Sequence, residues 1–207
     1  LDQIGPMARS VRDVAIATHI MAGPDELDST TLSDAMGMME AEVKPDLRGV
    51  TIGLPEQCWR AQDVGDVHHA VRAAVARLEA LGAAVTTVQI PSLEAAIPTY
   101  YLLTSAEAAS NLSRFDGIRY GQRAEAEDLN QTYTRTRSEG FGPEVQRRIL
   151  LGTFALAEGW ADDLYRRANS VRSRMRAEID QALATTDALM MPTAPTTAFR
   201  LGEKQMD

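Results

Sequence analysis

The segment from residue 49 to residue 91 constrains the fold most, because two strand patterns flank a helix pattern. The residues "GVTIGLP" (49–55) form a short apolar run closed by a proline, which is typical of a buried strand. The next pattern predicts a helix that begins at Asp66, carries one apolar stripe and ends at Gly82. "AAVTTVQIP" (83–91) predicts a second strand. Such a βαβ-like unit pairs its strands in parallel, so we expect an α/β fold.

The remainder of the chain is mainly helical. Ser10 caps a predicted helix that ends at Gly23, and the polar residues 24–48 predict a surface loop. Beyond Pro98 the apolar spacing predicts helices at 98–113, 126–138, 143–158 and about 160–185, followed by a buried strand in "DALMMPTAP" that ends at Pro192. These strands are too few to close a sheet, and the chain starts at Leu1 without a lead-in. We therefore expect an internal piece of a longer protein.

Composition narrows the class of protein. The 207 residues are 44% hydrophobic and 24% charged, as in ordinary globular domains. The sequence contains no run of about 18 apolar residues, so no membrane span is expected. The net charge of −8 argues against a general nucleic-acid surface. The arginines of "RRANSVRSRMR" (166–176) spread around their predicted helix, so a local nucleic-acid face stays only an alternative. One cysteine, Cys58, excludes an internal disulfide and fits a reducing compartment.

Several residue types that often carry chemistry have a structural interpretation here. His68 and His69 are adjacent, whereas helical metal ligands lie three or four residues apart, so we expect no metal site. Cys58 has no evident histidine partner, which favours a structural cysteine over a nucleophile. Neither common glycine-rich phosphate loop occurs.

The predicted helix 143–158 carries the most informative polar residue, Arg148. On a helical wheel this arginine lies inside a broad apolar arc, and a cation in such a position needs a partner. The small residues Gly152 and Ala155, one and two turns further on, predict a groove beside the guanidinium. A forked cation over a groove suits a carboxylate ligand held by two hydrogen bonds. The alternative is a structural ion pair with an acidic residue elsewhere in the fold.

Four segments resemble a known family. "LDQIGPMARSVRDVA" is similar to the sequence directly after the signature of the amidase signature family. Three others resemble the A subunits of glutamyl-tRNA(Gln) amidotransferases within that family: "SNLSRFDGIRYG", "TRSEGFGPEVQRRILLGTFAL" and "MPTAPTTAF". The resemblance extends over essentially all 207 residues and is most specific in the second half.

This resemblance implies an α/β/α layered fold with a central mixed sheet covered by helices, incomplete in this segment. Residues 1–207 would then be part of a single domain, downstream of the catalytic signature. The family hydrolyses amides with a serine nucleophile, a bridging serine and a lysine base, and all three would precede Leu1. Ser105 and Ser110 do not match those motifs, so no catalytic residue is assigned, and the segment alone is expected to be inactive.

For the A subunits, the resemblance implies hydrolysis of glutamine. The family's glutamine-binding arginine corresponds to Arg148 and its tyrosine contact to Tyr100, while an acidic partner for the substrate's amino group would lie beyond Asp207. The ammonia would pass to a B subunit that uses ATP and Mg²⁺ to amidate glutamate on tRNA, and a C subunit would complete a cytoplasmic heterotrimer. This chain itself is expected to bind no cofactor, metal or membrane and to meet tRNA only through the B subunit.

Two segments depart from the family pattern. "GWADDLY" (159–165) keeps Asp162 and Tyr165 but lacks the aromatic bulk usual there, and the loop 33–46 has no clear counterpart. Two other functions stay open at this point. One is a free-standing amidase of the same superfamily, and the other is a non-catalytic interaction domain. The preference between glutamate and aspartate on tRNA is set outside this sequence.

Overall fold

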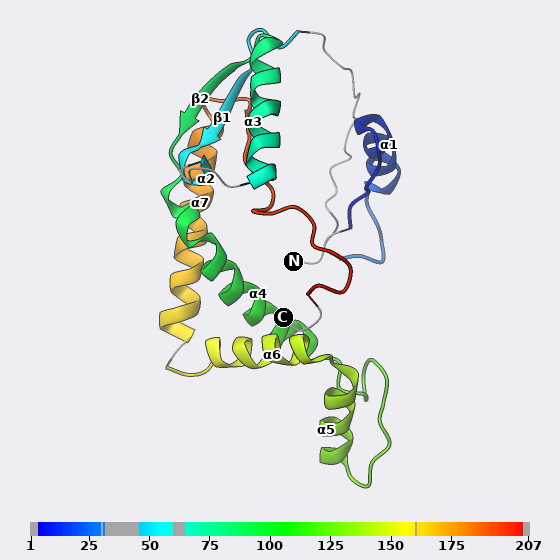
Figure 1. Ribbon diagram of the computed structural model, residues 1–207. Helices are drawn as coiled ribbons and strands as arrows, with labels where there is room; N and C mark the ends of the chain where they lie inside the picture. Colours follow the sequence, from blue (N-terminus) through cyan, green and yellow to red (C-terminus); the bar gives the residue numbers. More distant parts are fainter. Residues whose placement is uncertain (1–3, 30, 32–45, 60–64, 160, 205–207) are drawn as a thin grey trace. The chain divides into compact units, whose positions relative to one another are not determined.

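The structure is a computed structural model that describes residues 4–29, 31, 46–59, 65–159 and 161–204 (Figure 1). The contacts divide the chain into two compact units, Leu1–Leu47 and Arg48–Asp207. The prediction of a single domain is not tested by this division and stays a prediction. In the first unit, helix α1 (Val11–Met21) begins where predicted, because the Ser10 hydroxyl accepts a hydrogen bond from the Asp13 amide at 3.1 Å. Apart from Asp46, the loop 33–46 lies outside the described residues.

The second unit contains a three-stranded sheet in the order β2-β1-β3, with β1 at Thr51–Pro55, β2 at Ala84–Val88 and β3 at Ala188–Leu189. Both pairs are parallel, with Ile52 opposite Val85 on one side and opposite Ala188 on the other. The α/β class and the parallel pairing are therefore confirmed. Strand β3 is much shorter than the predicted run to Pro192. The described strands form only parallel pairs, so they include no antiparallel member of the expected mixed sheet.

The central strand is held by contacts across long sequence distances. The Asp187 carboxylate accepts from the Thr51 amide at 2.7 Å, and the Asp187 amide donates to the Thr51 carbonyl at 2.8 Å. At Gly53 an added Cβ would lie 2.7 Å from a methyl group of the Leu189 side chain, so the absent side chain leaves room for Leu189 on this face of the sheet. These contacts place Asp187 and the strand β3 that follows it next to a strand more than 130 residues earlier.

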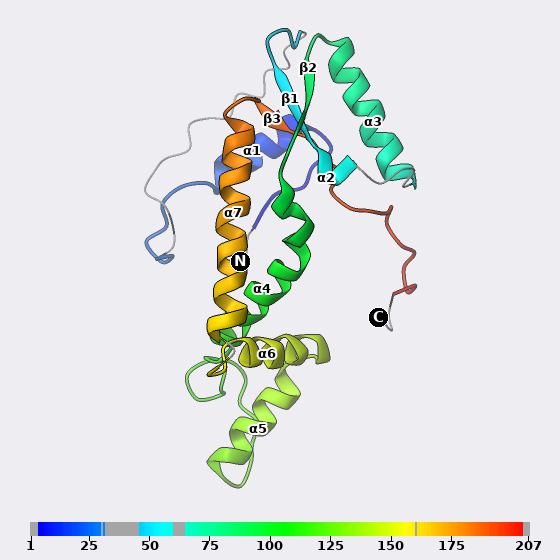
Figure 2. The same cartoon turned by 90° about the vertical axis from the view of Figure 1, so that its left-hand side faces the viewer.

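Helix α3 (Gly65–Ala80) lies between β1 and β2 in the chain and buries His68 and Val75. It begins one residue before the predicted start at Asp66. Helix α3 packs against β2, while α7 (Arg166–Leu183) packs against β3. Figure 2 shows the strands between these two helices. Two short elements were not predicted, because each is about one turn long: α2 at Glu56–Trp59 and the 3-10 turn η1 at Pro91–Ala95.

The remaining helices are α4 (Ala96–Leu112), α5 (Leu129–Gly140) and α6 (Pro143–Ala155). All three were predicted, with boundary shifts of up to three residues. Helix α5 starts late because the Asp128 carboxylate caps it, accepting from the Gln131 amide at 2.8 Å. The long helix predicted near 160–185 is divided into a π-helical turn, η2 (Ala161–Tyr165), and α7.

Helix α4 is the centre of the helical part, since it contacts α6, α7 and η1 (Figures 1 and 2). The Ser92 amide and hydroxyl in η1 both donate to the Glu178 carboxylate of α7, each at 2.9 Å, which ties the start of α4 to α7. Among the described residues, no helix is long and apolar enough to cross a membrane.

Candidate functional site

The crossing of α4 and α6 brings together the residues of the predicted binding site. At the crossing, Gly152 of α6 lies directly on the backbone of α4. A Cβ added there would lie 1.9 Å from the Ser105 carbonyl oxygen and 2.8 Å from the Ala109 Cβ. The next small residue, Ala155, is 1% exposed. Small side chains at this spacing let the two helix backbones approach closely.

This packing corrects the prediction of a groove beside Arg148. Gly152 does leave a hollow on the surface of α6, but α4 fills it, and Ala155 is itself buried. The predicted helix is also less enclosed than its apolar sequence suggests, because Leu150, Leu151 and Phe154 are at least half exposed. The small residues therefore fix the relative position of the two helices, and the polar groups beyond the crossing form the site.

The partner of Arg148 is Glu144, one turn earlier on the same helix. The Arg148 Nε donates to Glu144 Oε1 at 2.8 Å. The other carboxylate oxygen, Oε2, contacts Nη2 of Arg147 at 2.6 Å. The arginine was expected to be enclosed and paired with an acid elsewhere in the fold, or with a ligand. Instead its side chain is 31% exposed and its acidic partner is local, so water still reaches the guanidinium.

Two tyrosines of α4 lie next to the same guanidinium. Its Cζ atom lies over the Tyr101 ring, 5.8 Å from the centroid, and the Tyr100 and Tyr101 rings meet edge to face at 5.6 Å. Hydrogen bonds with Glu144 and, second, with Tyr100 raise the pKa of Arg148. Hydrogen bonds from Arg148 and Arg147 lower the pKa of Glu144. The structure thus brings Arg148 and Tyr100 together from residues 48 positions apart in the sequence.

The chemistry of this cluster is that of a carboxylate site. The guanidinium carries a permanent charge and five N–H donors in a planar fork, of which Glu144 uses the one on Nε. Tyr100 and Tyr101 are about half exposed, so the cluster, defined here as the Arg148 cluster (Tyr100, Tyr101, Glu144 and Arg148), is open on one side. It contains no nucleophile, and its only carboxylate is paired with arginines.

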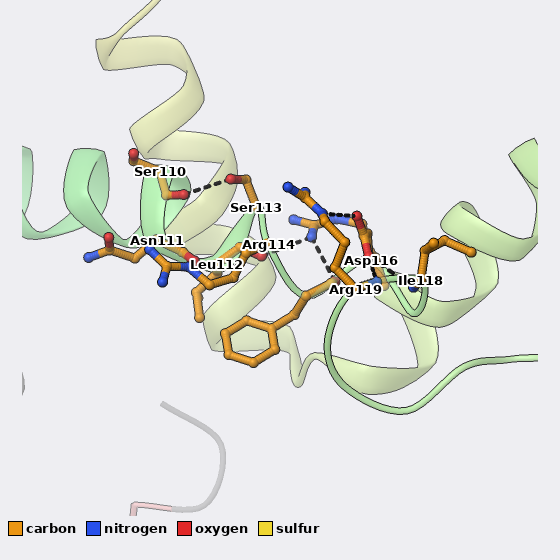
Figure 3. Close-up of polar contacts among 10 residues, drawn as sticks. Ser110, Asn111, Leu112, Ser113, Arg114, Asp116, Ile118 and Arg119 are labelled. Carbon is orange, nitrogen blue, oxygen red and sulfur yellow. Dashed lines mark hydrogen bonds and ion pairs between the residues drawn. The ribbon is translucent and has the colours of Figure 1, made fainter. Parts of the chain in front are cut away.

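A second ordered feature is the loop between α4 and α5, shown in Figure 3. The Asp116 carboxylate accepts from the amides of Ile118 and Arg119 and from the Arg119 side chain, and these bonds lower its pKa to about 2. From α5, Arg137 Nη1 donates to the carbonyls of Leu112 and Phe115 at 3.0 and 3.2 Å. The loop "SRFDGIRYG" is therefore held from both sides, but it contributes no residue to the Arg148 cluster.

The other candidates from the sequence lie outside the Arg148 cluster. His68 is buried, with Nε2 3.3 Å from the Cys58 carbonyl oxygen and its ring edge-on to Trp59. Burial raises the pKa of the Cys58 thiol, which disfavours the reactive thiolate. Ser105 is buried under Gly152, and Ser110 lines a cavity of about 290 Å³ together with Tyr165. In the basic run on α7 two arginines pair with acids one turn away, Arg167 with Asp163 and Arg176 with Asp180.

The sequence interpretation missed two members of the cluster. Glu144 could have been found, because acidic and basic residues four apart on a helix pair readily. Tyr101 follows Tyr100 directly, and no sequence signal separates their roles. Only the packing of α4 against α6 places the Tyr101 ring against the guanidinium.

Comparison with known proteins finds relatives over the whole chain. The Amidase family model matches residues 1–207. The chain is 48% identical over 208 residues to the A subunit of the glutamyl-tRNA(Gln) amidotransferase of Alcanivorax borkumensis, covering all of this chain and 42% of that protein. It is 45% identical over 207 residues to the A subunit of the Moorella thermoacetica enzyme, again with 42% of that protein covered. The chain thus spans about 42% of the length of these relatives.

Solved structures share the fold. The A subunit of the glutamyl-tRNA(Gln) amidotransferase of Thermotoga maritima superposes with a TM-score of 0.70 at 32% identity, covering 98% of this chain and 39% of that one. A solved amidase superposes with a TM-score of 0.61 at 27% identity, covering 96% of this chain and 36% of that one.

Proposed function

Since the chain belongs to the amidase family, we propose that it is a segment of the glutamine-hydrolysing subunit of a glutamyl-tRNA(Gln) amidotransferase. In this proposal the segment supplies part of the glutamine pocket, and the serine–serine–lysine chemistry comes from the signature segment of the family. The observation that carries the binding role is the Arg148 guanidinium, held by Glu144 through Nε and lying over the Tyr101 ring while remaining one-third exposed.

Arg148 would bind the α-carboxylate of glutamine. A carboxylate and a guanidinium form two parallel hydrogen bonds, and such charge-assisted pairs are about twice as strong as neutral ones. Tyr100, which lies beside Arg148 and helps to raise its pKa, would add a second contact to the same substrate. Fixing the carboxylate end would place the side-chain amide at the nucleophile, and positioning of this kind accounts for much of enzymatic rate enhancement.

The released ammonia would be used by a B subunit, with ATP and Mg²⁺, to amidate glutamate on tRNA, with a C subunit completing a cytoplasmic complex. Support for this assignment over a free-standing amidase comes from the solved structures, where identity is 32% to the amidotransferase A subunit of Thermotoga maritima and 27% to the amidase.

A chimaeric enzyme tests the proposal. Residues 1–207 replace the matching segment of the Alcanivorax borkumensis relative, and the chimaera is assembled with its B and C subunits. Amidation of Glu-tRNA is then measured with glutamine and, separately, with ammonia. Arg148→Lys keeps the charge but loses the planar fork, so kcat/KM for glutamine should fall roughly 10- to 150-fold, or about 1.5–3 kcal/mol.

Ammonia-dependent amidation should survive in Arg148→Lys, because ammonia needs no carboxylate contact. Arg147→Lys is the matched control, since Arg147 shares the Glu144 carboxylate but is 69% exposed. Two results would contradict the proposal. One is a wild-type chimaera without glutamine-dependent activity, and the other is an equal loss with both nitrogen sources together with a lower Tm.

A further inference from the structure

Glu144 is the residue of the Arg148 cluster to which no role has been assigned. Its carboxylate bridges two neighbouring arginines, Oε1 toward Arg148 and Oε2 toward Arg147. We infer that Glu144 is a positioning residue: it orients the Arg148 guanidinium so that the terminal nitrogens face the substrate carboxylate, and it thereby sets the affinity for glutamine. This inference rests on the proposed function of Arg148.

The atoms used by Glu144 support this role. Arg148 donates to Glu144 through Nε, on the edge of the guanidinium. The two terminal nitrogens, Nη1 and Nη2, carry four N–H groups, and a carboxylate can bind this end of the fork with both oxygens. A carboxylate that occupied the terminal nitrogens would compete with substrate. One that occupies Nε instead holds the group while leaving that end for a ligand.

The guanidinium is restrained from a second direction by the Tyr101 ring, 5.8 Å from Cζ. An arginine side chain has several rotatable bonds. Immobilising it on binding weakens the affinity for the ligand roughly 2- to 13-fold. Glu144 along one edge and Tyr101 under the plane remove much of this freedom before substrate arrives. Removing Glu144 should restore the freedom and weaken binding by a factor in that range.

The ion pairs of Glu144 are expected to contribute little to the stability of the fold, and Arg147 is the example. It contacts the same carboxylate through Nη2 and Nε, at 2.6 and 2.8 Å, but is 69% exposed. Exposed ion pairs one turn apart contribute little to stability. Substitutions at Glu144 or Arg147 should therefore leave Tm almost unchanged, which separates a positioning effect from loss of fold.

The test uses the assembled chimaeric enzyme, with Glu144→Ala, Glu144→Gln and Arg147→Ala. In Glu144→Ala the KM for glutamine should rise roughly 3- to 10-fold, while kcat changes less than about twofold. Glu144→Gln keeps a side-chain oxygen that accepts from Arg148 Nε, so it should recover part of the affinity. Arg147→Ala should leave KM for glutamine within about twofold of wild type.

The outcomes distinguish this inference from the proposed function. If Arg148→Lys raises KM for glutamine and Glu144→Ala does not, Glu144 has no positioning role although the glutamine site stands. If Arg148→Lys itself leaves KM unchanged, the proposed function fails, and the inference fails with it. A Glu144→Ala enzyme that loses activity equally with glutamine and ammonia, with a lower Tm, would show a structural role instead and overturn the inference.

Discussion

Replacing Gly152 by alanine should separate α4 from α6, although alanine favours helices. The added Cβ would lie 1.9 Å from the Ser105 carbonyl oxygen and 2.5 Å from its carbonyl carbon, whereas ordinary contact begins at 3.4 Å. The obstructing atoms belong to the backbone of α4, so no side-chain rotation relieves the clash. One helix must move away from the other.

The magnitude follows from two opposing terms. Overpacking a closely packed contact costs about 1–3 kcal/mol, and a clash with backbone belongs at the upper end of this range. The better helix propensity of alanine offsets about 1 kcal/mol. We therefore expect Gly152→Ala to lower the free energy of unfolding by about 2 kcal/mol, or Tm by roughly 4–8 °C for a chain of this size.

Thermal and urea unfolding of wild type and variant at submicromolar concentration, where association is avoided, measure this change by circular dichroism. Gly140→Ala is the matched control, because Gly140 also lies in a helix but has nothing within 4 Å of an added Cβ. That variant should be as stable as wild type or more stable by up to about 1 kcal/mol. If Gly152→Ala is as stable as Gly140→Ala, the close crossing of α4 and α6 is wrong, and with it the geometry that places Tyr101 against Arg148.

Two further predictions concern the chain by itself and its α4–α5 loop. The 207-residue chain should show no glutamine hydrolysis above a heat-killed control, and measurable hydrolysis would contradict this expectation. Its many exposed apolar side chains should make it associate at micromolar concentration. A monodisperse monomer in analytical ultracentrifugation would contradict the predicted association. The pKa of Asp116 should be about 2 in an NMR titration of its carboxyl carbon. This folded-state pKa lies below the unfolded value near 4, so the ionised carboxylate stabilises the fold above about pH 4. The Tm difference between wild type and Asp116→Asn should therefore be largest above about pH 4 and vanish as pH falls toward 2. A carboxyl midpoint near 4 would show that the bonds to Ile118 and Arg119 are not formed.

Much of the secondary structure could be predicted, because its causes are local. Ser10 caps the helix that follows it, and short apolar runs and period-3.6 patterns separate the strands of the sheet from its helices. The parallel pairing of β1 and β2 follows from the length of the connection between them. The boundary errors arose where capping bonds or a π-helical turn decide where a helix starts, as at Asp128 and in η2.

The sequence by itself determined the family, the class of fold and the choice of Arg148 and Tyr100 as candidates, since these depend on residue identity and on spacing along one element. Only the tertiary structure decided that α4 fills the hollow at Gly152 and that Tyr101 lies under the guanidinium. A helical wheel gives the direction of each side chain from its own axis. It contains no information on which other helix meets that side chain, or how closely, because those contacts join residues about 50 positions apart and depend on the packing of two whole helices.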